Sequence, residues 1–411
     1  SNSYTAQTLQ DLTPPSPKAY ELGKYGQTSV GLFTGTVNPS IPLYTYRTKN
    51  LQVPISLSYS SNGIKVDELG TNVGLGWSLN IGGVVTRITR DLPDNDRTDF
   101  YPTAKPRNTD WLHSIEVMNY LTNAADNANV DSETDLYMFN FNGYSGKFVF
   151  DNDHKIVMVP KQDIKIETIF INNKDGFRIT TPDGVAYTFQ DKEITRNLAE
   201  GGGHSTAGFY PSAWYLSTIK HPNGDEITFV YETESYNYIT SKQQSLVVTP
   251  LQYPCPTGTI SSSAVMSSPI SYRLTVSGVR LKEIRSNLPE EGKVLITSGT
   301  AHPEVSGSML VSALQVVDKN NVELERADFS YLLTTQKRAF LQKVSMKDPN
   351  NNYQFTYDDP TNFVARLSYS QDHWGYYNGI LNSDIVPNIS DPFYAAPIEV
   401  LGYFQSSGRG A

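Results

Sequence analysis

The sequence predicts a mainly β protein, with extended antiparallel sheets built from hairpins and arranged as a sandwich or a partly closed shell. Aromatic residues make up 11% of the 411 residues, and aromatic and β-branched side chains fit pleated, half-buried surfaces. The 29 glycines and 24 prolines are spread along the chain as turn signals. A short strand pattern recurs behind several of these turns. We also expect one short inserted helix, near residues 110–124.

The N-terminal part divides into a polar, proline-containing linker over residues 1–18 and a β module over residues 19–100. Within the module, apolar and polar residues alternate from Val53 to Tyr59, as in a strand with one buried face. The glycine-rich run from Gly74 to Leu79 follows, and its glycines allow backbones to approach closely. Trp77 is expected to be the large packed side chain of this run.

Residues 101–135 form a polar insertion that interrupts the strands. Asp110 is a residue type that caps helix N-termini. The apolar residues after it fall at helical spacing, namely Trp111, Ile115, Met118 and Leu121. We therefore expect a helix that packs on the sheet and covers its core.

Strands return in two further segments, which are separated by a loop. Residues 136–248 read as a β-hairpin module, and residues 270–411 as a C-terminal β module. Between them, residues 249–269 are rich in Ser, Pro and Thr and contain Cys255, the single cysteine. We expect this segment to be a long surface loop, and the lone cysteine excludes an internal disulfide and a CxxC motif.

A short unit recurs along the chain, in which two aromatic residues at positions i and i+2 are followed by an acidic residue. The copies are residues 148–151, 187–191, 229–232 and 355–358, with Gln190 inserted in the second and Glu232 as the acid of the third. The last three follow proline-led turns at residues 182–184, 222–224 and 349–351. Such turns close β-hairpins. We expect the aromatic rows to be core or inter-strand ladders.

The strand, Pro-Asn-Gly turn, strand and aromatic-acid order resembles the unit of RHS/YD-repeat proteins. Residues 53–59 and 74–79 are similar to the N-terminal region of these proteins and of Tc-toxin B components. Residues 143–148 and 372–379 resemble segments of the Bacteroidetes RHS group. The resemblance implies a secreted or cell-surface protein, with a removed signal peptide, whose sheets wind into a toxin-delivery or contact shell. A further RHS or effector region of the same polypeptide is then an expected partner.

Charge and composition exclude several function classes. The formal net charge is -9, which disfavours nucleic acid and anionic membrane surfaces as partners. No apolar run approaches the about 18 residues of a membrane-spanning helix. The histidines are scattered without HxH or HExxH spacing, and no phosphate-binding loop or GxSxG motif occurs. We therefore expect no resident cofactor and no enzyme activity.

Two clusters are candidate sites. The acidic loop has oxygen ligands that suit Ca²⁺, namely Asp91, Asp94, Asn95, Asp96 and Asp99. It lacks the spacing of an EF-hand, so a solvated acidic turn is the alternative. Asp372, His373 and Trp374 resemble a catalytic triple. Strand neighbours point to opposite faces, so we expect a structural corner in which Trp374 packs and His373 bonds to backbone.

Three functions stay open, in decreasing order of preference. The first is an exported, non-enzymatic β scaffold that binds a protein at the cell surface. The second is a glycan-binding module that stacks sugars on exposed aromatic side chains, and the third is a glycoside hydrolase. Exposure of the four tryptophans, Trp77, Trp111, Trp214 and Trp374, distinguishes the first two. A pair of carboxylates facing each other across a cleft would indicate the third.

Overall fold

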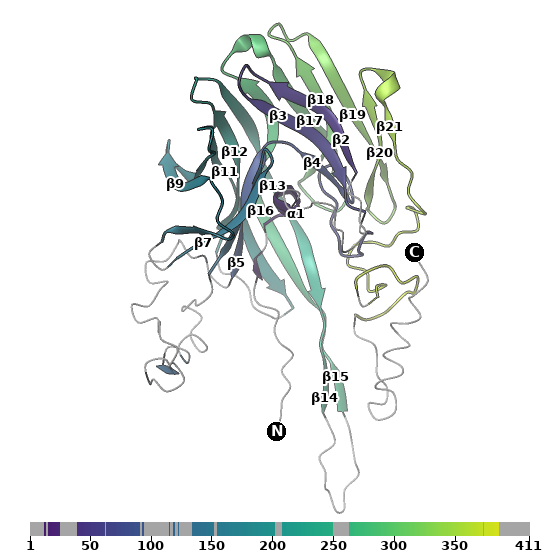
Figure 1. Ribbon diagram of the computed structural model, residues 1–411. Helices are drawn as coiled ribbons and strands as arrows, with labels where there is room; N and C mark the ends of the chain where they lie inside the picture. Colours follow the sequence, from purple (N-terminus) through teal and green to yellow (C-terminus); the bar gives the residue numbers. More distant parts are fainter. Residues whose placement is uncertain are drawn as a thin grey trace, which may run out of the picture.

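The computed structural model is mainly β and antiparallel, which confirms the fold class expected from the sequence (Figure 1). It describes residues 12–13, 15–24, 39–61, 63–90, 93, 115, 118–119, 122, 134–151, 154–201, 208–249, 263–372 and 374–385. All statements below concern this part of the chain.

A 16-stranded sheet dominates the described residues, in the order β21-β20-β19-β18-β17-β16-β11-β12-β5-β6-β7-β8. Outside this path, β1 pairs with β5, β10 with β9 and β11, and β13 with β12 and β16. The first strands are β1 (Leu12–Thr13), β5 (Gly83–Arg90), β6 (Leu136–Phe141), β7 (Tyr144–Phe150), β8 (Ile156–Met158), β9 (Lys165–Ile171) and β10 (Lys174–Thr180). The others are β11 (Ala186–Glu200), β12 (Tyr210–Lys220), β13 (Glu226–Gln243), β16 (Ile270–Ser286), β17 (Lys293–Ala301), β18 (Met309–Val317), β19 (Glu323–Leu333), β20 (Ala339–Met346) and β21 (Tyr353–Gln354).

Two smaller sheets accompany the large one. The three-stranded sheet consists of β2 (Ser40–Arg47), β3 (Gln52–Tyr59) and β4 (Trp77–Asn80). A two-stranded ribbon of β14 (Leu246–Thr249) and β15 (Ser263–Met266) extends β13 and β16 away from the body of the protein (Figure 1). The short helices are α1 (Pro17–Lys24), η3 (Pro289–Glu291) and η4 (Pro349–Asn351).

The three-stranded sheet packs its face on the large sheet. Ile55, Leu57 and Trp77 of the small sheet share one buried cluster with large-sheet residues such as Phe139 and Phe189. This is the packing by which two sheets bury their apolar faces against each other. The alternation seen between Val53 and Tyr59 thus corresponds to a buried face of β3.

Asp225 also connects the two sheets, at their turns. Its Oδ2 atom accepts hydrogen bonds from the Thr48 hydroxyl at 3.0 Å, from the Asn50 backbone N–H at 2.8 Å and from the Asn50 side chain at 3.1 Å. Thr48 and Asn50 lie in the β2–β3 turn, and Asp225 closes the β12–β13 turn. These bonds fix how the small sheet sits on the large one.

All three proline-led turns close hairpins as expected, because β10 pairs antiparallel with β11, β12 with β13 and β20 with β21. Gly184 N–H donates to Thr181 O at 2.9 Å between β10 and β11, and Gly224 N–H donates to His221 O at 3.0 Å between β12 and β13. Both glycines have positive φ, which the turns require. The third turn is η4, where Asp348 accepts a bond from Asn350 N–H.

The aromatic rows lie mainly in the core, as expected. Phe148, Tyr187, Phe189 and Phe229 are buried. The last copy departs from the expectation, because β21 ends at Gln354 and residues 355–357 have no strand backbone. The rings of this copy nevertheless pack, and Phe355 joins the main core cluster.

The expected inserted helix is described at only four positions. Residues 115, 118, 119 and 122 are helical, and the Thr122 hydroxyl donates to Met118 O at 2.8 Å. Ile115 and Met118 are 78% and 57% exposed. The expectation that these two side chains pack on the sheet is therefore wrong. Asp110, Trp111 and Leu121 lie outside the described residues.

The helix α1 was not expected from the sequence, where residues 1–18 were predicted to be a linker. The structure pairs Leu12 and Thr13 with β5 and buries Ser16. Pro17 at the first helical position after Ser16 was the signal that could have revealed the helix start.

Candidate functional site

The segment of residues 369–382, which we call the corner, is a series of turns held together by Asp372 and asparagine side chains. Asp372 Oδ1 accepts hydrogen bonds from the backbone N–H groups of Trp374 and Tyr376, both at 2.9 Å. The Asn382 side chain donates to Tyr369 O at 2.9 Å. Asp372 is therefore occupied as a turn-forming residue. His373 lies outside the described residues.

The corner packs on the loop of residues 63–68, which follows β3 and comes from the opposite end of the chain. Val66 N–H donates to Gly375 O at 2.8 Å, and Lys65 forms an isolated β-bridge with Tyr376. The Lys65 ammonium lies 5.8 Å from the centre of the Tyr376 ring, a cation–π distance. The loop after β3 and the segment near Asp372, which was singled out in the sequence, are thus brought together.

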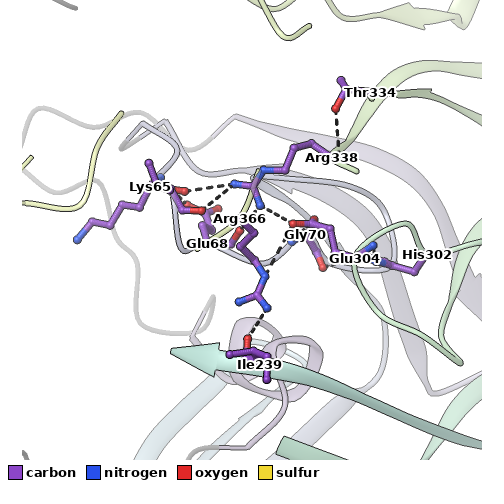
Figure 2. A network of polar contacts seen from close by, with 10 residues as sticks. Lys65, Glu68, Gly70, Ile239, His302, Glu304, Thr334, Arg338 and Arg366 are labelled. Atoms are coloured by element: carbon purple, nitrogen blue, oxygen red, sulfur yellow. Dashed lines mark hydrogen bonds and ion pairs between the residues drawn. The ribbon is translucent and has the colours of Figure 1, made fainter. Parts of the chain in front are cut away.

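Arg338, directly before β20, anchors this loop (Figure 2). Its Nη1 donates to Glu68 O at 2.9 Å and to Oε1 of Glu304, and its Nη2 donates to Val66 O at 3.2 Å. The Arg338 side chain has no exposed surface, and that of Glu304 is 4% exposed. A buried guanidinium whose two terminal nitrogens donate to loop carbonyls and one carboxylate fixes the loop backbone in place.

Arg366 connects the same carboxylate to the large sheet (Figure 2). Its Nε lies 3.9 Å from Glu304 Oε1, and its Nη2 donates to Ile239 O on β13. Burial lowers the pKa of Arg366, while Glu304 acts in the opposite direction. Glu304 thus lies between two arginines, one on the strand side and one on the segment that leads into the corner.

His302 completes the network with a defined tautomer. Its Nε2 lies 3.0 Å from Gly70 O, and its Nδ1 accepts from Glu304 N–H at 3.2 Å. Nδ1 therefore carries no proton and Nε2 carries one, as in neutral imidazole. Burial lowers the pKa of His302, against the attraction of Glu304.

The corner exposes apolar side chains above this buried anchor. Trp374 is 68% exposed and Leu381 is 89% exposed, and Tyr377 and Ile380 are also exposed. The expectation that Trp374 packs into the structure is thus corrected. The positive φ of Gly375 and the bond from Trp374 N–H to Asp372 hold the backbone at Trp374 so that its ring faces solvent.

Trp77 and Trp214 are core residues. The Trp77 Nε1 donates to the Tyr357 hydroxyl at 2.8 Å. The Trp214 ring meets Phe177 edge-on at 5.0 Å and lies 5.7 Å from the Arg87 guanidinium. Both indoles are buried, so neither offers a stacking surface to a ligand. Trp111 lies outside the described residues.

The calcium candidates Asp91, Asp94, Asp96 and Asp99 also lie outside the described residues, so Ca²⁺ binding stays a prediction. Within the described part of the chain, no group of three or more His, Cys, Asp or Glu residues could hold a metal ion. The described helices include none that is long and apolar enough to cross a membrane.

Comparison with known proteins places the chain in a family. The model of the family SpvB, described as Salmonella virulence plasmid 65kDa B protein, matches residues 32–250, more than half of the 411 residues. The chain is therefore a mainly β protein related to a virulence-plasmid protein. It belongs to the SpvB family.

Solved structures with low similarity include components of Tc toxins. "Crystal Structure of TcdB2-TccC3-TEV" matches with 13% identity and a TM-score of 0.38, over 86% of this chain and 16% of that chain. A Photorhabdus luminescens Tc holotoxin pore matches with 11% identity and a TM-score of 0.35, over 78% of this chain and 15% of that chain. The chain thus spans about a sixth of these relatives.

The N-terminal domain of effector protein SpvB from Salmonella typhimurium strain LT2 matches with 9% identity and a TM-score of 0.32, over 78% of this chain and 99% of that chain. No curated protein sequence matches. The Tc-toxin relation expected from the sequence stays a prediction. The RHS/YD-repeat and Bacteroidetes assignments stay predictions.

Proposed function

We propose that this chain is a non-enzymatic scaffold of an exported protein of the RHS/YD-repeat type, and that it docks a protein partner through the corner. The partner is another protein at the cell surface or a further region of the same polypeptide. The observation that carries the proposal is the exposed apolar surface of Trp374 and Leu381 above a buried anchor.

The corner has the composition of an interface. Protein interfaces are enriched in Trp and Tyr, and a few such residues supply most of the binding energy. The turn bonds of Asp372 and the Arg338 anchor hold the corner in one conformation. Such rigidity lowers the entropy cost of association.

The described carboxylates support a structural role. Asp225 is buried and the Glu304 side chain is 4% exposed, and their oxygens accept hydrogen bonds from other parts of the chain. A cavity beside α1 of about 60 Å³ is lined by one carboxylate, that of Glu234. Glycoside hydrolysis needs two carboxylates across a cleft, so this cavity does not supply the pair.

Site-specific photo-crosslinking in cells that produce the full-length protein tests the docking proposal. A benzophenone amino acid at position 374 is expected to give a discrete adduct with a protein or with a further region of the polypeptide. The control is the same amino acid at position 322, where Val322 is 58% exposed on the β18–β19 turn. Equal adducts at both positions, or none at 374, would contradict docking through the corner.

Glycan binding is the second candidate, favoured by the 68% exposure of Trp374 alone. An exposed indole face can stack on a sugar ring. The purified chain and its Trp374→Ala variant on a glycan array distinguish the two candidates. Binding of the wild type that the variant loses would replace the protein partner with a glycan.

A further inference from the structure

The described residues of the N-terminal segment, 12–13 and 15–24, lie between strands of the two sheets, and we call the space that they fill the groove. Leu12 and Thr13 pair with Arg90 and Thr89 of β5. Figure 1 shows α1 surrounded by strands, and α1 contacts β4 of the small sheet and β5 and β6 of the large sheet. The segment is thus an insert between two sheets that are joined by other contacts.

Glu193 of β11 is the polar centre of the groove. Its Oε1 accepts from Ser16 N–H at 2.8 Å and from the Ser212 hydroxyl at 3.1 Å. Its Oε2 accepts from the Ser16 hydroxyl at 2.5 Å and from the Tyr215 hydroxyl at 3.2 Å. Ser16 and Glu193 are buried. Each carboxylate oxygen therefore takes one bond from the segment and one from β12.

Lys18 supplies the complementary charge. Its ammonium donates to Val279 O at 3.0 Å, lies 3.8 Å from Glu234 Oε2 and lies 5.6 Å from the centre of the Tyr215 ring. Burial lowers the pKa of Lys18, whereas Glu234 and Glu193 raise it. The groove therefore presents two carboxylates to a segment that carries a cation two residues after Ser16.

The apolar contacts of the segment come from one face of α1. Ala19 is fully buried against Val84, Ala213 and Tyr215, and Leu22 packs on the same cluster. Tyr20, on the other side, is 40% exposed. On the large-sheet side of the groove the strands are paired in the order β11-β12-β5-β6, and β4 on the other side is paired with β3.

An eight-residue helix such as α1 is too short to persist in water on its own. It therefore forms when it docks, as in the recognition of a peptide by a preformed groove. We propose that the groove is a peptide-recognition site, that residues 12–24 are its resident ligand, and that another copy of this peptide can replace them. The class of ligand is a short helix with a serine cap and a lysine two residues later.

Exchange of the segment tests the proposal in the full chain. The variant Ser16→Ala/Lys18→Ala weakens the resident segment and leaves the groove intact. A fluorescent peptide of residues 12–24 is expected to bind this variant saturably in fluorescence anisotropy, and at least tenfold more weakly to the wild type, whose own segment competes. Adding Glu193→Ala to the variant is expected to abolish binding. Equal binding with and without Glu193, or no binding to a folded variant, would overturn the proposal.

Hydrogen exchange covers the case in which the double variant does not fold. In the wild type, the amides of residues 15–24 are expected to exchange before those of β18 and β19, and Glu193→Gln is expected to speed the first group alone. If both groups exchange together in both proteins, the segment is an integral core element and the proposal fails.

Discussion

Arg338 and Glu304 form an ion pair that is closed to solvent, between the start of β20 and the β17–β18 connection. The Arg338 guanidinium also donates to the carbonyls of the loop at residues 65–68, on which the corner packs. One buried pair thus joins the C-terminal strands, the N-terminal loop and the exposed surface proposed for docking. We therefore expect that breaking this pair lowers the free energy of unfolding substantially.

Replacing Arg338 by Ala is expected to lower the free energy of unfolding by about 3–5 kcal/mol, because it removes the nearer cation of a buried carboxylate and leaves Arg366 at 3.9 Å. Urea denaturation measures this loss. Arg326→Ala is the matched control, since Arg326 pairs with Asp328 at the surface and exposed pairs contribute at most about 1 kcal/mol. Similar losses in the two variants would show that the Arg338 pair is not an anchor.

His302 is expected to make the protein less stable in mild acid. Its pKa in the folded state is lowered by burial, while the unfolded chain has the ordinary value of about 6.5. As pH falls through that value, the unfolded state takes up the proton first, so the free energy of unfolding decreases until the lowered folded pKa is reached.

His302→Gln keeps a donor for Gly70 and an acceptor for Glu304 but does not titrate. Urea denaturation between pH 7 and pH 5 is expected to show that the free energy of unfolding falls less steeply in this variant than in the wild type. The two slopes are expected to differ by at most about 1.4 kcal/mol per pH unit. Identical pH dependence in both proteins would mean that His302 is not the titrating group.

The two tryptophans Trp214 and Trp374 are expected to separate stability from binding. Trp214→Ala removes a buried indole packed on Phe177 and is expected to cost about 3–5 kcal/mol. Trp374→Ala removes an exposed ring and is expected to change stability by no more than about 0.5 kcal/mol. Thermal unfolding followed by circular dichroism compares them. A large loss of stability in Trp374→Ala would make the corner a packing element.

Gly74 is expected to be sensitive to a methyl group. It has a φ of 97°, and an added Cβ would lie 3.0 Å from Leu341 N and 3.2 Å from Ala339 O. Both are backbone atoms of β20, so the strand or the loop would have to move. Gly74→Ala is expected to cost about 1–3 kcal/mol more than the φ penalty alone.

Gly143→Ala measures that penalty by itself, because Gly143 has a φ of 87° and nothing within 4 Å of the added Cβ. Its expected cost is about 1 kcal/mol. Equal midpoints of urea unfolding for the two alanine variants would mean that the close approach of the 71–76 loop to β20 is not required.

Local signals made the β architecture predictable. The turns at Gly184 and Gly224 depend on a few adjacent residues, and their hairpins follow from those residues alone. Trp77 was expected to pack because glycines surround it, and its ring does pack, on Tyr59 and Phe355.

The candidate site could not be predicted in the same way. Arg338, Glu304 and Arg366 meet only in the folded chain, and none of them has a periodic or spaced partner in the sequence. The contact of Ser16 with Glu193 likewise joins residues that are far apart. Trp374 was expected to be packed because aromatic residues are usually buried. The hydrogen bond from its backbone N–H to Asp372 instead holds it in a turn where its side chain faces solvent.

The central claim is that the corner docks a protein. Size-exclusion chromatography with light scattering, on the full-length gene product from its native cells, tests it most directly. If the partner is another protein, the wild type is expected to elute with the mass of a complex. If the partner is a further region of the same polypeptide, the wild type is expected to elute with the small hydrodynamic radius of a compact particle. Trp374→Ser/Leu381→Ser is expected to release the partner or to increase the hydrodynamic radius, with the thermal midpoint unchanged. Identical elution and mass for the two proteins would contradict the claim.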